Sequence, residues 1–345
     1  AQPFLAELAD AVHGRAVELG RQAVLIAESD LNDPKVVLPR DVNGYGLDAQ
    51  WADDFCHALE VQLVGQASSY AEEYGDFAHL GKALRQAFVY TGEYNASRRR
   101  RFGRAPQPAR RDQFVVFIQN HDQVGNRPGG ERLGHRITLP QQKLAAATVL
   151  LSPFVPLLFM GEEYGEPNPF LYFTQHEDSA LVEAVRAGRR EAFSLREDDA
   201  ATDPQDVATF ERSRVQLELH RAGVHQALHA FYRELLRLRR AIPTLTDPHA
   251  SRDVTEREAE RVFILQVHAR GDGAETLVIL GFADTESRVS LPIAAGDWTK
   301  RLDAGDTHFL GDGAVAPDRL LSDGVVELVV PPHAVLLFER GIQAG

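Results

Sequence analysis

The sequence lacks several features that would define a class of protein. Cys56 is the only cysteine among 345 residues, so no internal disulfide can form, and this favours a reducing compartment such as the cytoplasm. No apolar run is long enough to cross a bilayer, which argues against a helical membrane protein. Met160 is the only methionine, and the sequence starts at Ala1, where a helical pattern begins at once without a capping residue.

Positive charge is also scarce. The chain has 37 basic and 50 acidic residues, which gives a net charge of −13. Nucleic acids and anionic membranes bind basic faces, so we expect neither as a partner. A neutral ligand fits this charge better. The remaining composition, 44% hydrophobic and 25% charged, is that of a soluble globular enzyme, and 345 residues are enough for two domains.

The basic run Arg98–Arg101 is the exception to this acidic character. No Gly-rich phosphate loop accompanies it, so we expect a solvated or carboxylate-paired helix face rather than a phosphate site. Arg127 lies outside this basic run, and we expect its side chain to bind loop backbone or a carboxylate.

Three stretches share one design, in which a short apolar run leads directly into polar residues. The runs are 23–27 (AVLIA), 114–118 (FVVFI) and 155–160 (VPLLFM). Helical patterns, including 74–91 and 141–151, lie between them. Short, nearly continuous apolar strands that alternate with helices predict a parallel sheet with both faces covered.

From about residue 250 the pattern changes to short strand-like runs separated by Gly, Asp and Pro. The runs are RVFILQVHA, TLVILGFAD, SRVSLPI, VVELVV and AVLLFER. No helical pattern of any length intervenes, so this part is predicted to be an antiparallel β-sandwich of about a hundred residues. The helical pattern at 225–242 ends before Pro243 and predicts a domain boundary near residue 247.

Residues 114–126, FVVFIQNHDQVGN, run a buried strand into a cluster of polar side chains. In a β/α barrel the catalytic side chains lie at the carboxyl ends of the strands. Glu28 follows another strand in the same way, so Glu28 and Asp122 would meet over one pocket. Glycoside hydrolysis requires such carboxylates, because one protonates the leaving oxygen, one attacks the anomeric carbon, and negative charge stabilises the oxocarbenium-like transition state.

Two other interpretations of these residues stay open. A carboxylate at a strand end often caps the next helix or pairs with an arginine. The adjacent pair His121–Asp122 is also similar to the His-Asp pair of metal-dependent phosphohydrolases. Hard divalent cations bind carboxylates and imidazole, so a metal site is the second interpretation. Such a site needs further histidines at matched spacing, and neither His57 nor His79 begins a ligand-like motif. We therefore predict no metal.

Several motifs resemble those of a known family. QNHDQVGNR at 119–127 resembles the strand-seven motif of the α-amylase superfamily, glycoside hydrolase family 13, and VLIAESD at 24–30 resembles its strand-five motif, which carries the acid. Five further stretches resemble the subfamily of trehalohydrolases that act on maltooligosyl trehalose. They are AESDLNDP, GLDAQWADDFCHAL, YTGEYNASRRRRFGRAP, LLFMGEEYGEPNPFLYFTQHED and AVRAGRREAF. The resemblance covers about residues 1–240.

The resemblance implies a (β/α)8 (TIM) barrel, whose second half spans 1–247, followed by an antiparallel β-sandwich at 248–345. It implies a retaining hydrolase that cleaves the α-1,4 bond next to the terminal trehalose of maltooligosyl trehalose and related α-glucans, without a cofactor. Glu28 would be the general acid/base. Asp122 would stabilise the transition state, and His121 would bind hydroxyls of the sugar being cleaved.

One part of the family's machinery has no match here. The family's nucleophile is an Asp in a strand-four motif of the type RLDAVH, and Asp10, the only Asp in 1–27, lies inside a helical pattern. We expect this motif to lie upstream of Ala1, together with the first four barrel strands and the N-terminal domain common in the family.

Six other residues are candidates for sugar binding, and four of them have a structural alternative. They are Asp30, Trp51, Asp53, Asp54, Gln123 and Tyr172. Trp51 would stack on the apolar face of a sugar or pack in the core. Asp53 and Asp54 would bind hydroxyls or serve on the surface or in a helix cap. Tyr172 would shape the substrate site or pack its loop onto the barrel.

Two alternative functions stay open. A glucan-branching or other transglycosylating enzyme of the superfamily would use the same three carboxylates with a sugar hydroxyl as acceptor. A non-catalytic sugar-binding module would need no nucleophile. The products formed from maltooligosyl trehalose distinguish the first alternative, and the effect of Glu28→Gln on turnover and binding distinguishes the second.

Overall fold

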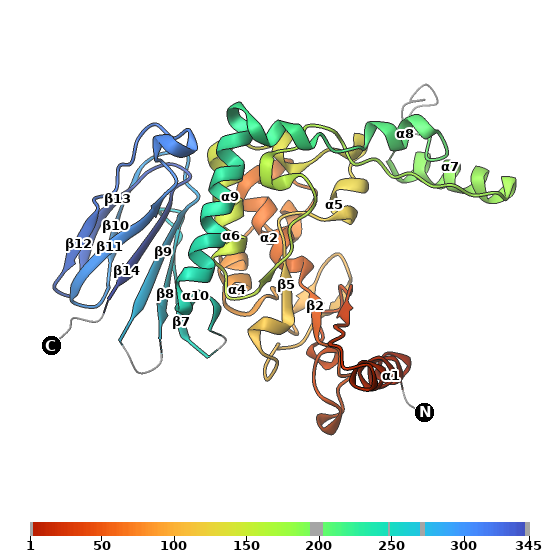
Figure 1. The fold of residues 1–345 in the computed structure, drawn as a ribbon, viewed down its shortest axis with the longest axis horizontal. Coiled ribbons are helices and arrows are strands. Elements are labelled where there is room, and N and C mark those ends of the chain that lie inside the picture. Colours follow the sequence, from red (N-terminus) through yellow and green to blue (C-terminus); the bar gives the residue numbers. More distant parts are fainter. Residues whose placement is uncertain (1–2, 194–202, 248, 270–272, 342–345) are drawn as a thin grey trace.

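A computed structural model describes residues 3–193, 203–247, 249–269 and 273–341. Ala1, before which we expect further barrel strands, lies outside these ranges. Short parallel strands and helices make up the first part of the chain, and antiparallel strands make up the rest (Figure 1). Within the described ranges, no helix is both long and apolar enough to span a membrane.

The first part is built on a four-stranded parallel sheet. Its strands, adjacent in chain order, are β1 (Ile26–Ala27), β2 (Ala49–Trp51), β5 (Phe114–Val116) and β6 (Val155–Pro156). Every neighbouring pair is parallel, so the parallel sheet predicted from the three apolar runs is confirmed. β2 has no predicted counterpart because its sequence, Ala-Gln-Trp, contains no apolar run.

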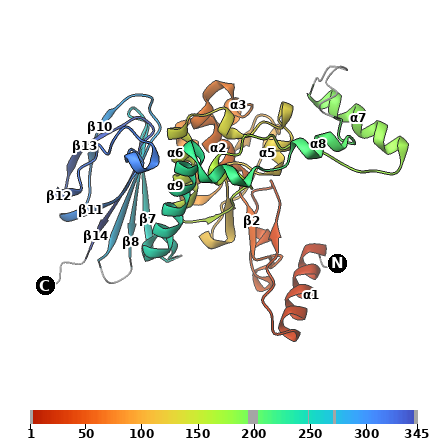
Figure 2. The same cartoon turned by 45° about the horizontal axis from the view of Figure 1, so that its top comes forward.

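Helices separate this sheet from the C-terminal strands (Figures 1 and 2). The covering helices are α2 (Asp53–Val64), α4 (Phe77–Gln86), α6 (Leu139–Leu150) and α9 (Gly223–Ala241). Their apolar side chains share one core with Phe114 and Val116 of β5. The edge residues Ile26 and Val155 are 50% and 37% exposed. The prediction that both faces of the sheet are covered therefore holds for β5 but is wrong for the edge strands within the described residues.

The remaining helices connect or flank these layers. They are α1 (Phe4–Glu18), α3 (Ala71–Tyr74), α5 (His121–Gly125), α7 (Ser179–Phe193), α8 (Val207–Arg212) and α10 (Pro243–Thr246). The predicted helices at 141–151 and 225–242 correspond to α6 and α9. The pattern at 74–91 yields a shorter helix, because α4 begins after Asp76 and ends before Ala87, whose φ is 68°. In both views α7 and α8 project from the body and form an arm (Figures 1 and 2).

The basic run Arg98–Arg101 does not lie on a helix, so the expected helix face is wrong. It forms the turn and second strand of a hairpin between β3 (Tyr94–Asn95) and β4 (Arg100–Arg101). The Asn95 side-chain oxygen accepts a hydrogen bond from the Arg98 backbone N–H, a local bond that favours a turn over a helix. Arg98 also donates to Asp30 at 2.7 Å, so the expected carboxylate pairing is confirmed for this arginine.

The C-terminal part contains two antiparallel sheets. One has the strand order β12-β11-β14-β9-β8-β7, and the other pairs β10 with β13. The strands are β7 (Ser251–Arg257), β8 (Val262–His268), β9 (Glu275–Gly281), β10 (Ser287–Leu291), β11 (Gly296–Asp303), β12 (Arg319–Ser322), β13 (Val326–Val330) and β14 (Val335–Arg340). Trp298, at 0% exposure, shares one core with Val289 and Leu328. The antiparallel architecture is confirmed, although β7, β11 and β12 were too rich in polar residues to predict.

A buried lysine joins the two parts of the chain. Lys143 on α6 is 2% exposed, and its Nζ donates to the carbonyl oxygens of Ala304 at 2.5 Å and Phe309 at 3.2 Å. Burial lowers the pKa of Lys143. Because a buried ammonium group loses its hydration, these two hydrogen bonds are needed to keep it in place. Lys143 therefore fixes the turn after β11 against α6.

Replacement of this lysine should loosen the junction. We expect Lys143→Ala to lower the free energy of unfolding by about 2–3 kcal/mol, because it leaves a cavity and two unpaired carbonyl groups. Lys82, whose partly exposed side chain pairs with Glu93 at 2.6 Å, provides the control. Lys82→Ala should cost less than about 1 kcal/mol. Chemical denaturation of both variants measures the difference, and equal losses would contradict the role given to Lys143.

Candidate active site

The strand ends bring Glu28, His121 and Asp122 together. Glu28 directly follows β1, and the other two residues form the first turn of α5, which follows β5. His121 Nε2 lies 3.5 Å from Glu28 Oε1 and 3.5 Å from Asp122 Oδ1. One polar atom from each of the three residues lies within 4.8 Å of the other two. The side chains are 53%, 47% and 55% exposed, so two carboxylates and an imidazole share one open site.

The amides around Asp122 form a capping box. The Asn120 side-chain oxygen accepts hydrogen bonds from the backbone N–H groups of Asp122, at 2.8 Å, and Gln123, at 3.3 Å. The Gln123 side-chain oxygen accepts in return from the Asn120 N–H at 3.1 Å. This arrangement satisfies the free N–H groups of the first helical turn. Gln123 is only 7% exposed, so its main visible role is to hold the turn that carries His121 and Asp122.

Beside Asp122 lies a pocket of about 300 Å³. Its lining consists of Asp53, His57, Ser69, Tyr70, Asp122, Gln123, Asn126 and Arg127. The rings of His57 and Tyr70 stack with centroids 3.8 Å apart and an interplanar angle of 19°. Carboxylates, amides and a guanidinium group can bind sugar hydroxyls, and aromatic rings suit the apolar face of a sugar. The lining therefore has the chemistry of a carbohydrate site.

The Asp53 carboxyl group lines this pocket and has an altered acidity. Burial raises its pKa from 3.8 to about 7, and the neighbouring carboxylates of Asp54 and Asp122 contribute to the increase. Glu28 and Asp30 act in the same direction. Near neutral pH, Asp53 therefore carries a proton on a substantial fraction of molecules and can donate a hydrogen bond as well as accept one.

Trp51, Asp30 and Tyr172 lie around the site but do not line the 300 Å³ pocket. The Trp51 ring meets the His121 ring edge-on at 6.0 Å, so this tryptophan packs beside the imidazole. Asp30 is engaged by Arg98. Tyr172 is 40% exposed, and the Arg189 guanidinium lies 4.2 Å from the centre of its ring.

The Asp54 side chain is buried in the protein interior, at 3% exposure. Its carboxylate accepts four hydrogen bonds from the protein. The donors are Asn32 Nδ2 (2.6 Å), Tyr74 Oη (2.8 Å), the Val89 N–H (2.7 Å) and the Tyr90 N–H (2.9 Å). Burial raises the pKa of this carboxyl group despite these bonds. With its oxygens occupied, Asp54 favours the structural alternative over contact with a sugar.

The predictions missed His57, Ser69, Tyr70 and Asn126 as residues that line the pocket. A signal for His57 was present in the sequence. Asp53, His57 and Glu60 are spaced i, i+4 and i+7 on α2, which places them on one face of the helix. Tyr70 comes from the loop after α2 and has no comparable signal.

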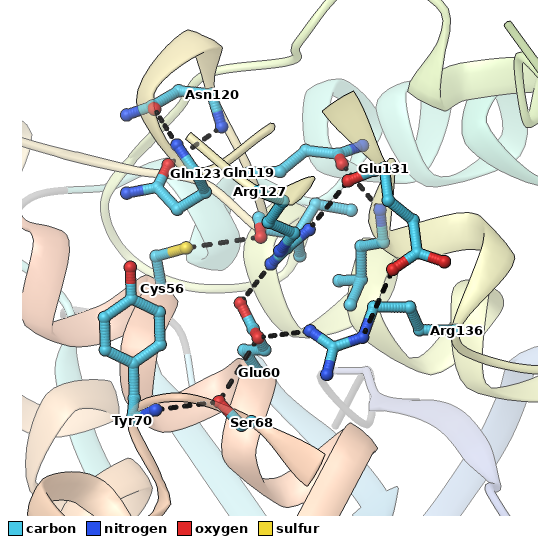
Figure 3. Close-up of polar contacts among 12 residues, drawn as sticks. Cys56, Glu60, Ser68, Tyr70, Gln119, Asn120, Gln123, Arg127, Glu131 and Arg136 are labelled. Carbon is cyan, nitrogen blue, oxygen red and sulfur yellow. Dashed lines mark hydrogen bonds and ion pairs between the residues drawn. The ribbon is translucent and has the colours of Figure 1, made fainter. Parts of the chain in front are cut away.

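A buried ionic network adjoins the pocket and shares Arg127 with its lining; its contacts are drawn in Figure 3. Glu60, at 1% exposure, binds the guanidinium groups of Arg127 and, at 2.9 Å, Arg136. Ser68 donates to the same carboxylate at 3.2 Å. Arg127 also donates to the Glu131 carbonyl oxygen at 3.3 Å. The prediction that Arg127 holds loop backbone or a carboxylate is confirmed on both counts.

The cluster of Glu28, His121 and Asp122 also has the spacing to hold one cation. Carboxylate oxygens and an imidazole nitrogen are suitable ligands for divalent metals. Among the described residues, no other group of three acidic, histidine or cysteine side chains has this spacing. The expected absence of a metal stays a prediction, which chelation tests.

A larger cleft of about 660 Å³ lies between α9 and β11. None of the candidate residues lines it. Several of its charged side chains already form ion pairs, such as Arg237 with Glu234 at 2.6 Å and Arg301 with Glu339 at 3.1 Å. Size alone therefore does not make this cleft the reactive site.

Comparison with known proteins confirms the resemblance seen in the motifs. The chain is 42% identical over 237 residues to the malto-oligosyltrehalose trehalohydrolase of Saccharolobus solfataricus, which is 69% of this chain and 39% of that protein. It is 40% identical over 317 residues to the malto-oligosyltrehalose trehalohydrolase of Arthrobacter ramosus, with 90% and 53% of the two chains covered. No family model matches the chain.

A solved structure from Salmonella typhimurium, assigned as an α-amylase, shares the fold. It aligns with a TM-score of 0.76 and 30% identity and covers 97% of this chain and 54% of that one. The chain thus spans about half the length, or less, of the proteins that it matches. This partial coverage fits the prediction that the chain corresponds to the C-terminal part of such proteins.

The altered pKa of Asp53 predicts a pH-dependent contribution to stability. Between about pH 4 and pH 7 the folded chain keeps a proton on Asp53 that the unfolded chain has lost. The stabilisation from Asp53 is therefore complete below about pH 4 and is lost as the pH rises through 7. In Asp53→Asn the side chain stays neutral, so the melting temperature of the unmodified protein should fall relative to the variant across this window.

Thermal unfolding of both proteins at pH 4 to 8.5 measures this difference. Ser69→Ala alters the same pocket without removing a titrating group and should shift the melting temperature by a constant amount. A constant offset for Asp53→Asn as well would show that Asp53 does not titrate in this window.

Proposed function

We propose that this chain forms part of a retaining trehalohydrolase that cleaves the α-1,4 bond next to the terminal trehalose of maltooligosyl trehalose. The supporting observation is the convergence of Glu28, His121 and Asp122 at the ends of parallel strands, beside a pocket with sugar-binding chemistry. The similarity to malto-oligosyltrehalose trehalohydrolases supports the same substrate. The net charge of −13 suits a neutral oligosaccharide.

In the proposed reaction Glu28 first acts as an acid. It transfers its proton to the glycosidic oxygen while the bond between that oxygen and the anomeric carbon breaks, and a nucleophilic carboxylate forms a covalent bond to the same carbon. Glu28 then acts as a base and removes a proton from water, whose oxygen displaces the carboxylate. Two inversions give net retention. The nucleophile is an Asp in a strand-four motif that these 345 residues do not contain, and we propose that it precedes Ala1.

Asp122 and His121 act on the sugar rather than on the leaving group. The Asp122 carboxylate binds hydroxyl groups of the cleaved sugar, and its negative charge stabilises the oxocarbenium-like transition state. The His121 imidazole lies 3.5 Å from both carboxylates and binds a hydroxyl of the same sugar. The 300 Å³ pocket beside Asp122 holds a neighbouring sugar unit.

We further propose that residues 1–247 are the second half of a (β/α)8 barrel and that residues 248–345 are its β-sandwich domain. Exposed apolar side chains on both edges of the parallel sheet support a closed barrel, because further strands would cover them. They include Val24 (65% exposed) and Ile26 (50%) beside Glu28, and Val155 (37%) and Leu158 (37%) on the opposite edge. We also propose a cytoplasmic location. The one cysteine of the chain, Cys56, is buried and cannot form an internal disulfide, and such chains are typical of a reducing compartment.

The names of the relatives favour hydrolysis over the two alternatives, a transglycosylating enzyme and a non-catalytic sugar-binding module. We therefore advance no second function.

The proposed reaction is tested with maltooligosyl trehalose and the full-length protein. The unmodified protein should release free trehalose, whereas longer or branched products would indicate transglycosylation. Glu28→Gln should lower kcat by at least about 100-fold, because the amide cannot donate and take up the proton, while affinity for the oligosaccharide changes only a few-fold. Product chromatography and calorimetric binding measure the two effects.

Glu18→Gln is the matched control. Glu18 lies on α1, pairs with Arg15 at 2.7 Å and is 66% exposed, so its replacement should leave kcat unchanged. Survival of full turnover in Glu28→Gln would remove Glu28 from the role of acid. A chelator should not affect trehalose release, and loss of activity that added metal restores would instead support a cation bound by Glu28, His121 and Asp122.

A further inference from the structure

One motif of the resemblance has no place in the proposed reaction. AVRAGRREAF, residues 184–193, lies on α7, in the arm formed by α7 and α8. The arm projects from the body on the side opposite the C-terminal sheets (Figures 1 and 2). Its arginines differ in what they bind, and this difference suggests a function for the motif.

Arg186 holds the arm together internally. Its guanidinium donates to both oxygens of Asp203, at 3.0 and 2.7 Å, and to Glu183 at 2.7 Å. These partners belong to α7 and to the segment before α8, so Arg186 links parts of the arm to one another.

Arg189 connects the arm to the helix that carries Asp122. Its Nη2 donates to the carbonyl oxygen of Gly125, the last residue of α5, at 2.7 Å. Its Nη1 donates to the side-chain oxygen of Asn126 at 2.8 Å. A positive charge at the last carbonyl groups of a helix is electrostatically favourable and satisfies an otherwise free acceptor. Arg189 thus fixes the end of a helix only five residues long.

The same contact sets the orientation of the Asn126 amide. A guanidinium group can only donate hydrogen bonds, so the amide oxygen of Asn126 must face Arg189. The amide nitrogen then points to the opposite side, where Nδ2 lies 3.4 Å from Asp122 Oδ1. Asn126 also lines the 300 Å³ pocket. Arg189 therefore reaches the carboxylate through one intervening side chain.

Tyr172 provides the third contact. The Arg189 guanidinium lies 4.2 Å from the centre of this ring, a distance typical of a cation–π interaction. One arginine of the arm thereby holds α5, the Asn126 amide and the loop that carries Tyr172.

We propose that Arg189 is a positioning residue for the glycosidase site, which orients Asp122 through Gly125 and Asn126. This inference rests on the proposed function for its catalytic consequence. Asp122 stabilises charge that develops only in the transition state, so a misplaced Asp122 should lower kcat more than it alters substrate binding. Lysine has a single nitrogen in place of the fork whose two nitrogens bind Gly125 and Asn126, and it lacks the planar group that lies over Tyr172, so Arg189→Lys should restore only part of the activity.

The test compares Arg189→Ala, Arg189→Lys and Asn126→Ala in the full-length protein, with the exposed neighbour Arg190→Ala as control. We expect kcat to fall about tenfold in Arg189→Ala, with less than about a threefold change in KM and a melting temperature within a few degrees. Arg189→Lys should be intermediate, and Arg190→Ala should match the unmodified protein. In the Asn126→Ala background, Arg189→Ala should cost clearly less than tenfold, because the two side chains act in series.

Hydrogen exchange gives a second readout that needs no turnover. In Arg189→Ala the backbone amide of Asn126, which bonds to the Asp122 carbonyl at 3.0 Å, should exchange about tenfold faster, while amides of α6 keep their rates. Unchanged exchange in α5, or equal effects of Arg189→Ala and Arg190→Ala, would overturn the inference. If trehalose release failed in the unmodified protein, the proposed function would fail, and the exchange result would still decide whether Arg189 orders α5.

Discussion

The pocket depends on a single buried anion, Glu60. Its carboxylate is 1% exposed and lies between two guanidinium groups, those of Arg127 and Arg136, with Ser68 as a third donor. A charge in this position is tolerated only because these partners replace its hydration, and removal of one partner would leave an uncompensated charge in the interior. The partners come from the loop after α2 and from the segment after α5. Glu60 therefore ties two of the segments that line the pocket to α2, which supplies Asp53 and His57.

Four carboxylates in and near the site fall into two groups with different surroundings. Glu60 and Asp54 are buried, and hydrogen bonds from the protein occupy their oxygens. Glu28 and Asp122 are about half exposed, and their shared neighbour is His121 at 3.5 Å. The first group stabilises the fold, because its hydrogen-bonding capacity is already used. The second group keeps oxygens available for a ligand, as a catalytic carboxylate must.

Prediction from the sequence succeeded where one segment contains the whole signal. β5, α6 and α9 have clear apolar patterns, and Glu28, His121 and Asp122 come within a few residues of the ends of apolar runs, so parallel pairing brings them to one edge. The pocket could not be predicted in the same way, because its lining combines one face of α2, the loop after α2, α5 and the residues after α5. Asp53 and Asp54 show the limit clearly. They are adjacent and chemically identical, but successive residues of a helix point about 100° apart, so one faces the pocket and the other the interior. Only packing decides which is which.

In the segment 120–125 the backbone is held rigidly, whereas the reactive side chains stay exposed. The two properties are compatible because different atoms provide them. The backbone of 120–125 is fixed at its start by the reciprocal bonds of Asn120 and Gln123 and at its end by the bond from Arg189 to the Gly125 carbonyl. Between these two anchors, the side chains of His121 and Asp122 stay about half exposed and can reach a substrate. Preorganisation of this kind lowers the cost of reaching a charged transition state, because the acceptor does not have to be reoriented when the charge develops. It also explains two of the amides in QNHDQVGN: Asn120 and Gln123 fix the backbone of the turn, and the Asp122 carboxylate remains about half exposed.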